Sequence, residues 1–465
     1  MIMKWIEPEI AEYEHGKPPS IWISVVLFIV IYIGFFVVTV LQWKQGKPVI
    51  SAGFFTRVLL VPLLLWGALC SALHFNYEDW NERVDMWNWL RRMIYADWRW
   101  WAQERVAILG RVALTPEKDV AVRMFGLEGS APANAGKILP LVTEKGNSAS
   151  RVQQVLEQLV TPFAPYMQDI VGRHTFSVVV QSEREEDLND LRALLRKLAP
   201  RDFDFVKITR VPQALDMGLI EEWLSGNAMP DFSLVLAYQL HAAGVEPTCS
   251  EAAAALLFTP RTVITRSNGK LKPEAWLFRP VPAAMDTVFE KLRTLLAAQP
   301  TPNDRIKHLW LTHVPGQGKH AVVTAVKDTD LKLAVHDIDT AIGKPGPVSV
   351  LLAQALAAGM VQHGQGTQLL ATPHKAGLVL NLVGTSLAPI PRVEQRLMKT
   401  VNICLTTFLV CIALLLLLLF IDAQAPSGCS IAVIVSLPLI VAGQLVLSFV
   451  RRSRVKDDFY RRLPW

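Results

Sequence analysis

The chain has 465 residues, of which 51% are hydrophobic and 19% charged, and its formal net charge at pH 7 is +6. A mean hydropathy of +0.28 excludes a chain that is soluble along its whole length and predicts membrane segments. The basic residues concentrate at the borders of apolar runs, which favours contact with anionic lipid headgroups over nucleic acid as a partner.

Four apolar runs are long enough to cross the roughly 30 Å hydrocarbon core of a bilayer. The first resembles a signal peptide in position, but it is longer than the roughly 7 to 15 apolar residues of such a peptide and has no small-residue cleavage site behind it. We therefore predict four retained spans in two hairpins: 21–43 and 58–75 within residues 1–75, and 400–421 and 431–450 within residues 399–450.

Basic residues indicate the orientation of these spans. Four spans place both termini and the large middle segment on one side of the membrane. The tail 451–465 carries six Lys and Arg residues, whereas the loop 422–430 carries none. Because basic flanks stay in the cytoplasm, we expect the termini and the middle segment there, in a bacterial inner membrane. Three basic residues in the first hairpin loop, Lys44, Lys47 and Arg57, argue the other way.

Residues 76–104 form a tryptophan-rich segment that no proline interrupts, which predicts a long helix continuing out of the second span. Trp80, Trp87 and Trp101 follow a seven-residue spacing, and Trp98 lies on the adjoining stripe. Tryptophan favours the membrane headgroup region, so this face contacts the membrane or a partner helix, or it docks the middle domain. The sequence leaves these alternatives open.

Residues 105–398 alternate strand-like and helix-like segments, which indicates an α/β domain. The strand-like runs are rich in β-branched residues, and the helical runs carry apolar residues at helical spacing. The predicted strands include 174–182, 203–211, 232–240, 308–314, 319–326 and 376–384, and the predicted helices include 185–199, 284–299 and 347–359.

Three blocks in this region, in this order, resemble the thiolase-like fold of ketosynthases, the condensing enzymes that join acyl units. Residues 214–240 resemble the helix after the nucleophile, a Ser-Gly turn and the next core strand. Residues 249–263, "CSEAAAALLFTPRTV", are similar to an Ala-rich strand of the family. Residues 343–358, "GKPGPVSVLLAQALAA", resemble its late turn and small-residue helix. The resemblance covers about residues 205–385.

The resemblance implies a cysteine nucleophile at a helix start, facing two histidines. Counting back from Ser225 places the nucleophile position at Thr209, and no cysteine occurs between residues 205 and 248. The second histidine position is Lys344, which cannot accept a proton in its charged form. His313 corresponds to the first histidine. We therefore expect a degenerate site at Thr209, His313 and Lys344.

Other motifs give no cofactor or metal site. The sequence "PGQGK" lacks the spacing of a phosphate-binding loop, and His308, His313 and His320 share no common face. Cys249 is the only cysteine of the middle domain, which we expect to be a buried small residue. The run "HGQGT" at 363–367 copies the letters of the family's first histidine loop out of order, so we expect a loop that enters a strand.

These observations predict a cytoplasmic α/β domain with a thiolase-like (ketosynthase-like) fold and four transmembrane helices. The first functional hypothesis is a catalytically inactive scaffold or adaptor that forms a homodimer, as the fold implies. Its layout resembles accessory membrane proteins of bacterial secretion systems such as type VI. The alternatives are an enzyme of acyl or lipid metabolism, and a transporter or immunity protein in which the spans carry the function.

Overall fold

The structure is a computed structural model that describes residues 3–43, 51–142, 150–182, 184–198, 203–212, 214, 217–226, 229–242, 244–394, 401–424 and 426–463. The chain divides into two compact units. One, here called the central domain, comprises the N-terminal residues up to Glu7 and residues 97–390. The other, the helical unit, comprises residues 8–96 and the chain from Pro391 onward.

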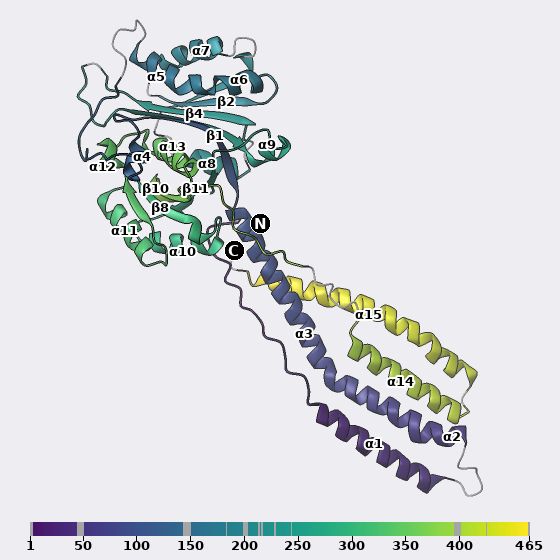
Figure 1. Ribbon diagram of the computed structural model, residues 1–465. Coiled ribbons are helices and arrows are strands. Elements are labelled where there is room, and N and C mark those ends of the chain that lie inside the picture. Colours follow the sequence, from purple (N-terminus) through teal and green to yellow (C-terminus); the bar gives the residue numbers. More distant parts are fainter. Residues whose placement is uncertain are drawn as a thin grey trace. The chain divides into compact units, whose positions relative to one another are not determined.

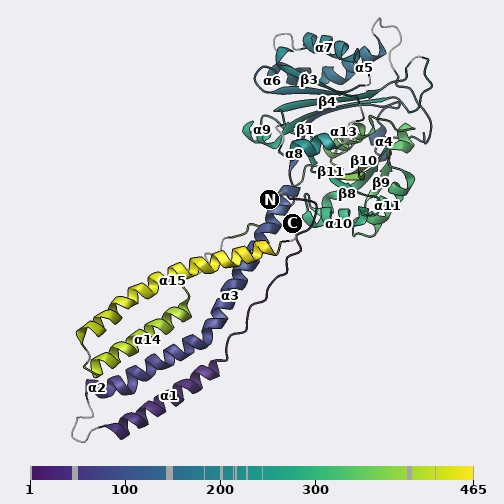
Figure 2. The same ribbon diagram turned by 180° about the vertical axis from the view of Figure 1, so that it is seen from behind.

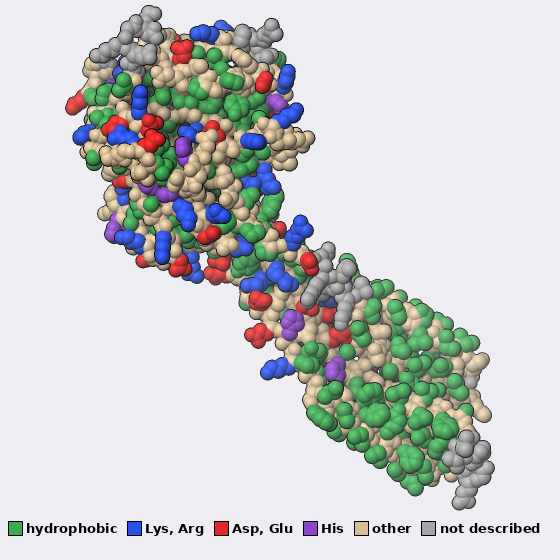
Figure 3. Space-filling view, in the orientation of Figure 1, with side chains coloured by type: hydrophobic (Ala, Val, Ile, Leu, Met, Phe, Trp, Pro, Cys, Tyr) green, Lys and Arg blue, Asp and Glu red, His purple; other side chains and the backbone are tan. Residues whose placement is uncertain are grey.

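The helical unit contains the four candidate membrane spans among the described residues. These are Ile21–Gln42 (α1), the continuous helical stretch Ala52–Ala102, Ile403–Asp422 (α14) and Ser427–Arg461 (α15). The second stretch contains α2 (Ala52–Phe55), a π-helical turn at Thr56–Leu60 and α3 (Val61–Ala102). Their outward surface is densely hydrophobic (Figure 3), as a bilayer requires. Four helices are thus long and apolar enough to cross a membrane, at the positions predicted from sequence.

Polar contacts fix the helix ends of this unit. The Glu78 carboxylate accepts the backbone N–H groups of Ile403 and Cys404 at 3.2 and 2.7 Å, at the start of α14. At the far end of α14, Asp422 pairs with Arg57 at 2.7 Å. Negative charge at a helix N-terminus and satisfied end groups stabilise α14. Residues 395–400, which include the predicted start of the third span at Thr400, lie outside the described residues.

Among the described residues of the central domain, eleven strands form one mixed sheet in the order β3-β2-β4-β5-β1-β6-β11-β10-β8-β9, with β7 also paired to β11. The strands are β1 (Arg105–Leu114), β2 (Phe176–Gln181), β3 (Val206–Val211), β4 (Phe232–Gln239), β5 (Ala252–Pro260), β6 (Ala275–Phe278), β7 (Val281–Ala283), β8 (Ile306–Leu311), β9 (Ala334–Asp337), β10 (Thr367–His374) and β11 (Gly377–Gly384). The helices are α4 (Val120–Met124), α5 (Arg151–Val160), α6 (Ala164–Ile170), α7 (Asp187–Leu198), α8 (Gly218–Leu224), α9 (Arg261–Arg266), α10 (Val288–Ala298), α11 (Gly316–Lys327), α12 (Ile338–Ile342) and α13 (Ser349–Gln362), with 3₁₀ turns at Thr161–Phe163, Phe203–Phe205 and Asn303–Arg305.

The sheet consists of two halves with the same topology. In the first half, β2 pairs in parallel with β3 and β4, and β5 runs antiparallel to β4 and β1. In the second half, β8 pairs in parallel with β9 and β10, and β11 runs antiparallel to β10 and β6. We number the strands of each half in chain order and leave β7 aside. Both halves then have the spatial order third, second, fourth, fifth, first. The central domain is an internal duplication whose halves meet at the antiparallel pair β1 and β6.

Side chains alternate between layers along the strands, as a sheet buried on both faces requires. Leu234 and Leu236 of β4 belong to the outer cluster under α5, α6 and α7, whereas Val235 belongs to the middle cluster around α13. On β8, Leu309 faces the outer cluster with α10 and α11, and Trp310 faces the middle cluster. The result is five layers, helices and sheet alternating, with α13 in the middle (Figures 1 and 2).

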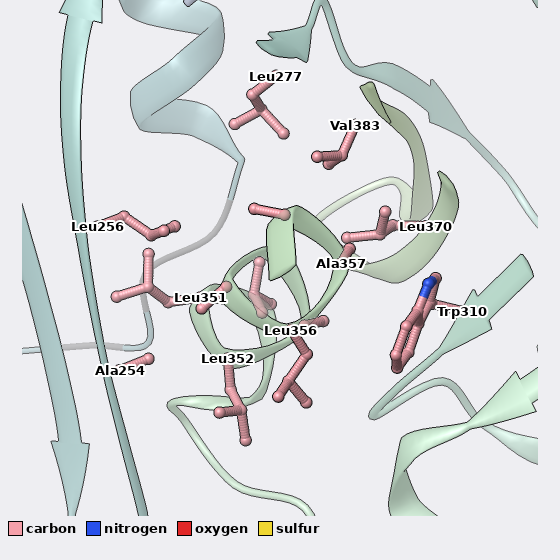
Figure 4. Packing of buried hydrophobic residues seen from close by; sticks show 14 of the residues in the cluster. Ala254, Leu256, Leu277, Trp310, Leu351, Leu352, Leu356, Ala357, Leu370 and Val383 are labelled. Atoms are coloured by element: carbon pink, nitrogen blue, oxygen red, sulfur yellow. The ribbon is translucent and has the colours of Figure 1, made fainter. Parts of the chain in front are cut away.

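Helix α13 is the centre of the domain. All but one of its residues, Gln362, are buried, and its side chains contact both halves of the sheet (Figure 4). Small residues such as Ala353 and Ala357 let the strands approach the helix closely. A helix that is apolar all round is expected only where both faces are covered.

The prediction of a strand at 319–326 is wrong, because these residues lie in α11. Val322, Ala325 and Val326 are buried at helical spacing, and Pro315 is the N-cap residue. The β-branched residues of this run resembled a strand, but their burial follows the 3.6-residue period. The run 363–367 connects the end of α13 to the start of β10 at Thr367, as predicted.

Candidate functional site

The duplicated topology identifies the helix on which a condensing enzyme would carry its nucleophile. Each half sends its chain from the third strand through the middle layer to the fourth strand. In the second half α13 makes this connection, and in the first half α8 makes it, between β3 and β4. Helix α8 starts at Gly218 with Met217 as its N-cap residue. The resemblance implies a nucleophile at this helix start.

Met217 occupies this position and is 1% exposed. The Nε2 of Gln354, from the buried helix α13, donates to the Met217 Sδ at 2.7 Å. Between α8 and α13 a cavity of about 20 Å³ remains, lined by residues that include Ile220, Phe258 and Gln354. A cavity that holds a small-molecule ligand is usually about 300 to 1,000 Å³. The helix start is therefore packed by side chains, and the sequence between residues 212 and 218 contains no thiol or hydroxyl.

Thr209, the predicted nucleophile position, lies in a strand and not at a helix start. Thr209 is exposed in the edge strand β3, where it lies opposite Val179 in the parallel pair with β2. The count back from Ser225 assumed a longer helix, but α8 has only seven residues. The helix start therefore lies eight to nine residues later in the chain than the count predicted.

His313 follows β8 and enters a loop, as predicted, in a left-handed conformation with a φ of 52°. Its ring is exposed, whereas its backbone N–H donates to both oxygens of Asp339 at 3.1 and 3.0 Å. The Lys319 Nζ binds Asp339 at 2.8 Å and Asp337 at 2.8 Å. Burial alone would lower the pKa of Lys319, but the hydrogen bonds to the two carboxylates raise it. This ion cluster holds the loop, and sequence reasoning missed it because Lys319 was assigned to a strand.

Lys344 contributes its backbone rather than its side chain. The side chain is exposed, the backbone N–H donates to the Lys137 carbonyl at 2.8 Å, and the carbonyl accepts from the Ser250 N–H at 2.9 Å. The preceding Gly343 has a φ of 90°, and a Cβ there would overlap the Lys137 carbonyl and the Ser250 hydroxyl. The structure thus joins the late turn to the Ala-rich strand block through backbone hydrogen bonds. His313 and Lys344 flank α12, whereas Thr209 lies at the opposite end of the strand order.

Glu251 is the most completely buried carboxylate of this region, at 0% exposure. It accepts hydrogen bonds from the N–H groups of Leu141 and His241 at 2.7 and 2.6 Å and from Arg151 at 3.0 and 2.6 Å. Burial raises the pKa of Glu251, but the Arg151 guanidinium and the two N–H donors outweigh that effect and lower it. All its acceptor positions are used by the protein, so Glu251 serves structure and is not free to transfer protons.

His308 and His336 form a hydrogen-bonded pair at the edge of the second half, with Nδ1 and Nε2 3.0 Å apart. The Phe125 ring stacks on His336 at a centroid distance of 4.2 Å. Burial and the neighbouring His308 lower the pKa of His336 to about 4, and burial also lowers the pKa of His308. Both rings are neutral at pH 7. Within the described ranges, no group of three or more His, Cys, Asp or Glu side chains is placed to hold a metal ion.

The four tryptophans proposed for membrane or partner contact separate into two kinds. Trp98 is 1% exposed, and its Nε1 donates to the Lys4 carbonyl at 3.2 Å. Trp101 packs edge-on against Trp5 at 5.1 Å. Both rings thus pack against other residues of the central domain, Trp98 buried and Trp101 half-buried. In the helical unit, Trp87 is 6% exposed, whereas Trp80 is 45% exposed. Trp80 is the member of the set that remains available to a membrane.

Cys249 is half-buried beside the turn before α13, where a Cβ on Gly346 would lie 2.9 Å from its Sγ. The Gln239 side chain closes the same turn, because its Oε1 accepts from the Val348 N–H at 3.1 Å. The turn is thus filled by protein groups. The prediction that Cys249 packs as a small residue agrees with this contact, although the residue is not fully enclosed.

No protein-family model matches this sequence, and no curated protein matches it. Solved structures do match. They include a type II polyketide ketosynthase in complex with its acyl-carrier protein (14% identity, TM-score 0.44, 61% of this chain and 99% of that chain) and an oxazolomycin ketosynthase domain from Streptomyces albus (14%, 0.42, 63% and 100%). A β-ketoacyl synthase from Burkholderia phymatum also matches (11%, 0.41, 61% and 100%).

At these identities the likeness concerns the fold alone. The duplicated strand order and the five alternating layers agree with it and with the three sequence blocks. The central domain is an α/β domain whose two halves share one topology, and its fold is similar to that of these ketosynthases.

Proposed function

We propose that the protein is a membrane-anchored scaffold or adaptor whose thiolase-like domain has no condensing activity. The observation that carries this proposal is the start of α8, where the buried Met217 contacts Gln354 of α13. A thioether cannot act as the nucleophile of acyl transfer, and the cavity of about 20 Å³ beside it does not admit an acyl chain. The exposed lysine at position 344 adds to this argument.

Acyl labelling tests the proposal directly. Incubation of the full-length protein in detergent with labelled acyl-CoA, and separately with labelled acyl-carrier protein, is expected to leave no covalent label on the chain. The Cys249→Ala variant is the matched control, because it removes the only thiol of the central domain. Label that appears on the wild-type protein and disappears from this variant would establish an acyl-enzyme and refute the scaffold proposal.

Two-fold association is the second part of the proposal. The edge strand β3 leaves one side of its backbone unpaired among the described strands, and Phe205 immediately before it is 67% exposed. Strands at sheet edges associate readily, and apolar residues beside them favour a homodimer.

Light scattering of the detergent-solubilised chain is expected to give twice the mass of one chain. Phe205→Asp is expected to give the mass of one chain, whereas Leu127→Asp, at a 47% exposed residue, leaves the mass unchanged. Equal masses for the wild-type protein and Phe205→Asp would remove β3 as the interface.

Placement in a bacterial inner membrane is the third part, with the termini and the central domain in the cytoplasm. It is supported by the basic C-terminal end of α15 and by the absence of Lys and Arg from the sequence 422–430. A fluorescent protein fused after residue 465 is expected to fluoresce, and alkaline phosphatase at that point is expected to be inactive. Fusions after Gln424 should give the opposite pair of results. Active phosphatase at residue 465 would reverse the topology.

The finer assignment, as an accessory of a bacterial secretion system such as type VI, is supported by the layout of the sequence alone. It has a simple test. Purification of the solubilised chain from its own cells should recover secretion-system components. Recovery of acyl-metabolising enzymes instead would favour the alternative function in lipid metabolism.

A further inference from the structure

A groove of about 840 Å³ lies on the central domain at the outer side of the second half-sheet. It is bordered by α10, by the start of β8 and by the connection from α11 to β9. Its apolar wall includes Phe289, Leu296 and Leu331, and Phe289 is 44% exposed. We call it the α10–β9 groove. It lies on the opposite face of the sheet from the middle layer, so it is separate from the start of α8.

The rim of the α10–β9 groove carries three cations and three anions. Among the described residues none of the six forms a salt bridge or a side-chain hydrogen bond. Unpaired charges of both signs around an apolar floor suit a ligand that itself carries both charges and apolar groups. The six are Arg293, Lys307, Lys332, Asp304, Asp328 and Asp330.

A polar atom within the groove lining also lacks a partner. The Asn303 Nδ2 donates to the Leu296 carbonyl at 3.3 Å, but the enclosed Oδ1 accepts no hydrogen bond. A buried acceptor without a donor costs about 1 to 3 kcal/mol. Because this oxygen is enclosed by protein atoms, a ligand in the open groove does not reach it.

The groove leads directly into a free strand edge. Its last lining residue, Lys332, lies two positions before β9, which is the terminal strand of the sheet order. Edge strands are usually protected by charge or proline. The opposite edge, β3, carries Lys207 and Arg210. The charge of β9 is confined to its last residue, Asp337, which pairs with Lys319, whereas Val335 is uncharged and 46% exposed.

We propose that the α10–β9 groove binds an extended peptide segment of a protein partner. The segment adds a strand to the free edge of β9 and places an apolar side chain against Phe289 and Leu331. Backbone hydrogen bonds supply the affinity of such strand addition, and side-chain pockets supply its specificity. The inference deepens the scaffold proposal. It rests on that proposal, because the occupant is taken to be a segment of a protein partner.

The probe is a phage-displayed library of random dodecapeptides, selected on the full-length protein in lipid nanodiscs with counter-selection on Phe289→Asp. Enriched peptides are expected to alternate apolar and polar residues. By fluorescence anisotropy they should bind Phe289→Asp at least about tenfold more weakly than wild type, as for a central interface aromatic. Val335→Asp, which places a charge at a 46% exposed position of the edge strand, should weaken binding similarly. Val245→Asp, at a 65% exposed residue of the β4–β5 connection, should not.

The outcomes separate the two proposals. The docking site is overturned if selection on the wild-type protein enriches no peptides after counter-selection on Phe289→Asp. It is also overturned if the enriched peptides bind both proteins equally. An N-methylated version of an enriched peptide that binds as tightly as the parent overturns strand addition. Acyl labelling of the same preparation reports on the scaffold proposal independently, because the thiol and the α8 start lie in other parts of the domain.

Discussion

Replacing Glu251 with alanine is expected to lower the free energy of unfolding of the central domain by about 3 to 5 kcal/mol. The substitution leaves the N–H groups of Leu141 and His241 and the Arg151 guanidinium without their common acceptor. These donors tie the segment before α5 and the end of β4 to the start of β5, so three parts of the first half lose a shared contact. Urea denaturation of the detergent-solubilised chain, followed by tryptophan fluorescence, measures the loss.

The control for this prediction is Glu186→Ala. Glu186 is exposed just before α7, so its removal should change the unfolding free energy by no more than about 0.5 kcal/mol. Because the pKa of Glu251 is lowered in the folded protein, its contribution is present above the unfolded-state pKa and is lost as the pH falls through the folded-state value. Equal losses for the two variants would show that Glu251 is not part of a stabilising network.

Periodicity and length were sufficient to predict the elements that local sequence determines. The first span was predicted at 21–43 and is Ile21–Gln42, because an uninterrupted apolar run has only one stable form in a bilayer. The apolar run 232–240 predicted β4 to within one residue.

Features that depend on tertiary contacts were not accessible from the sequence. Trp98 appeared suited to a membrane face, but the segment near Lys4 returns to cover it, a contact across 94 positions of the chain. Thr209 lies in β3, because the helix that precedes Ser225 has only seven residues and begins at Gly218. The pairing of His308 with His336 depends on the parallel register of β8 and β9, in which Trp310 lies opposite His336. No spacing in the sequence encodes that register.

The His308–His336 pair makes the stability of the central domain fall on mild acidification. Burial and the neighbouring His308 lower the pKa of His336 from 6.5 to about 4. Between these values the unfolded chain binds more protons than the folded chain, so stability decreases as the pH falls through this window. One group of this kind contributes up to about 1.4 kcal/mol for each pH unit. Protonation would also place a charge beside Phe125 and break the acceptor role of one ring.

His336→Gln is the matched variant, because the amide can still donate and accept hydrogen bonds but does not titrate. Thermal unfolding of wild-type protein is expected at progressively lower temperature from pH 7 to pH 4.5, and the variant should show a flatter profile over the same range. The measurement stays at or above pH 4.5, the ordinary pKa of a glutamate, and the pKa of Glu251 is lowered from this value, so the acid loss of that carboxylate falls mainly below the measured range. Superimposable profiles for the two proteins would mean that the imidazole pair does not control the acid response, and that carboxylates elsewhere do.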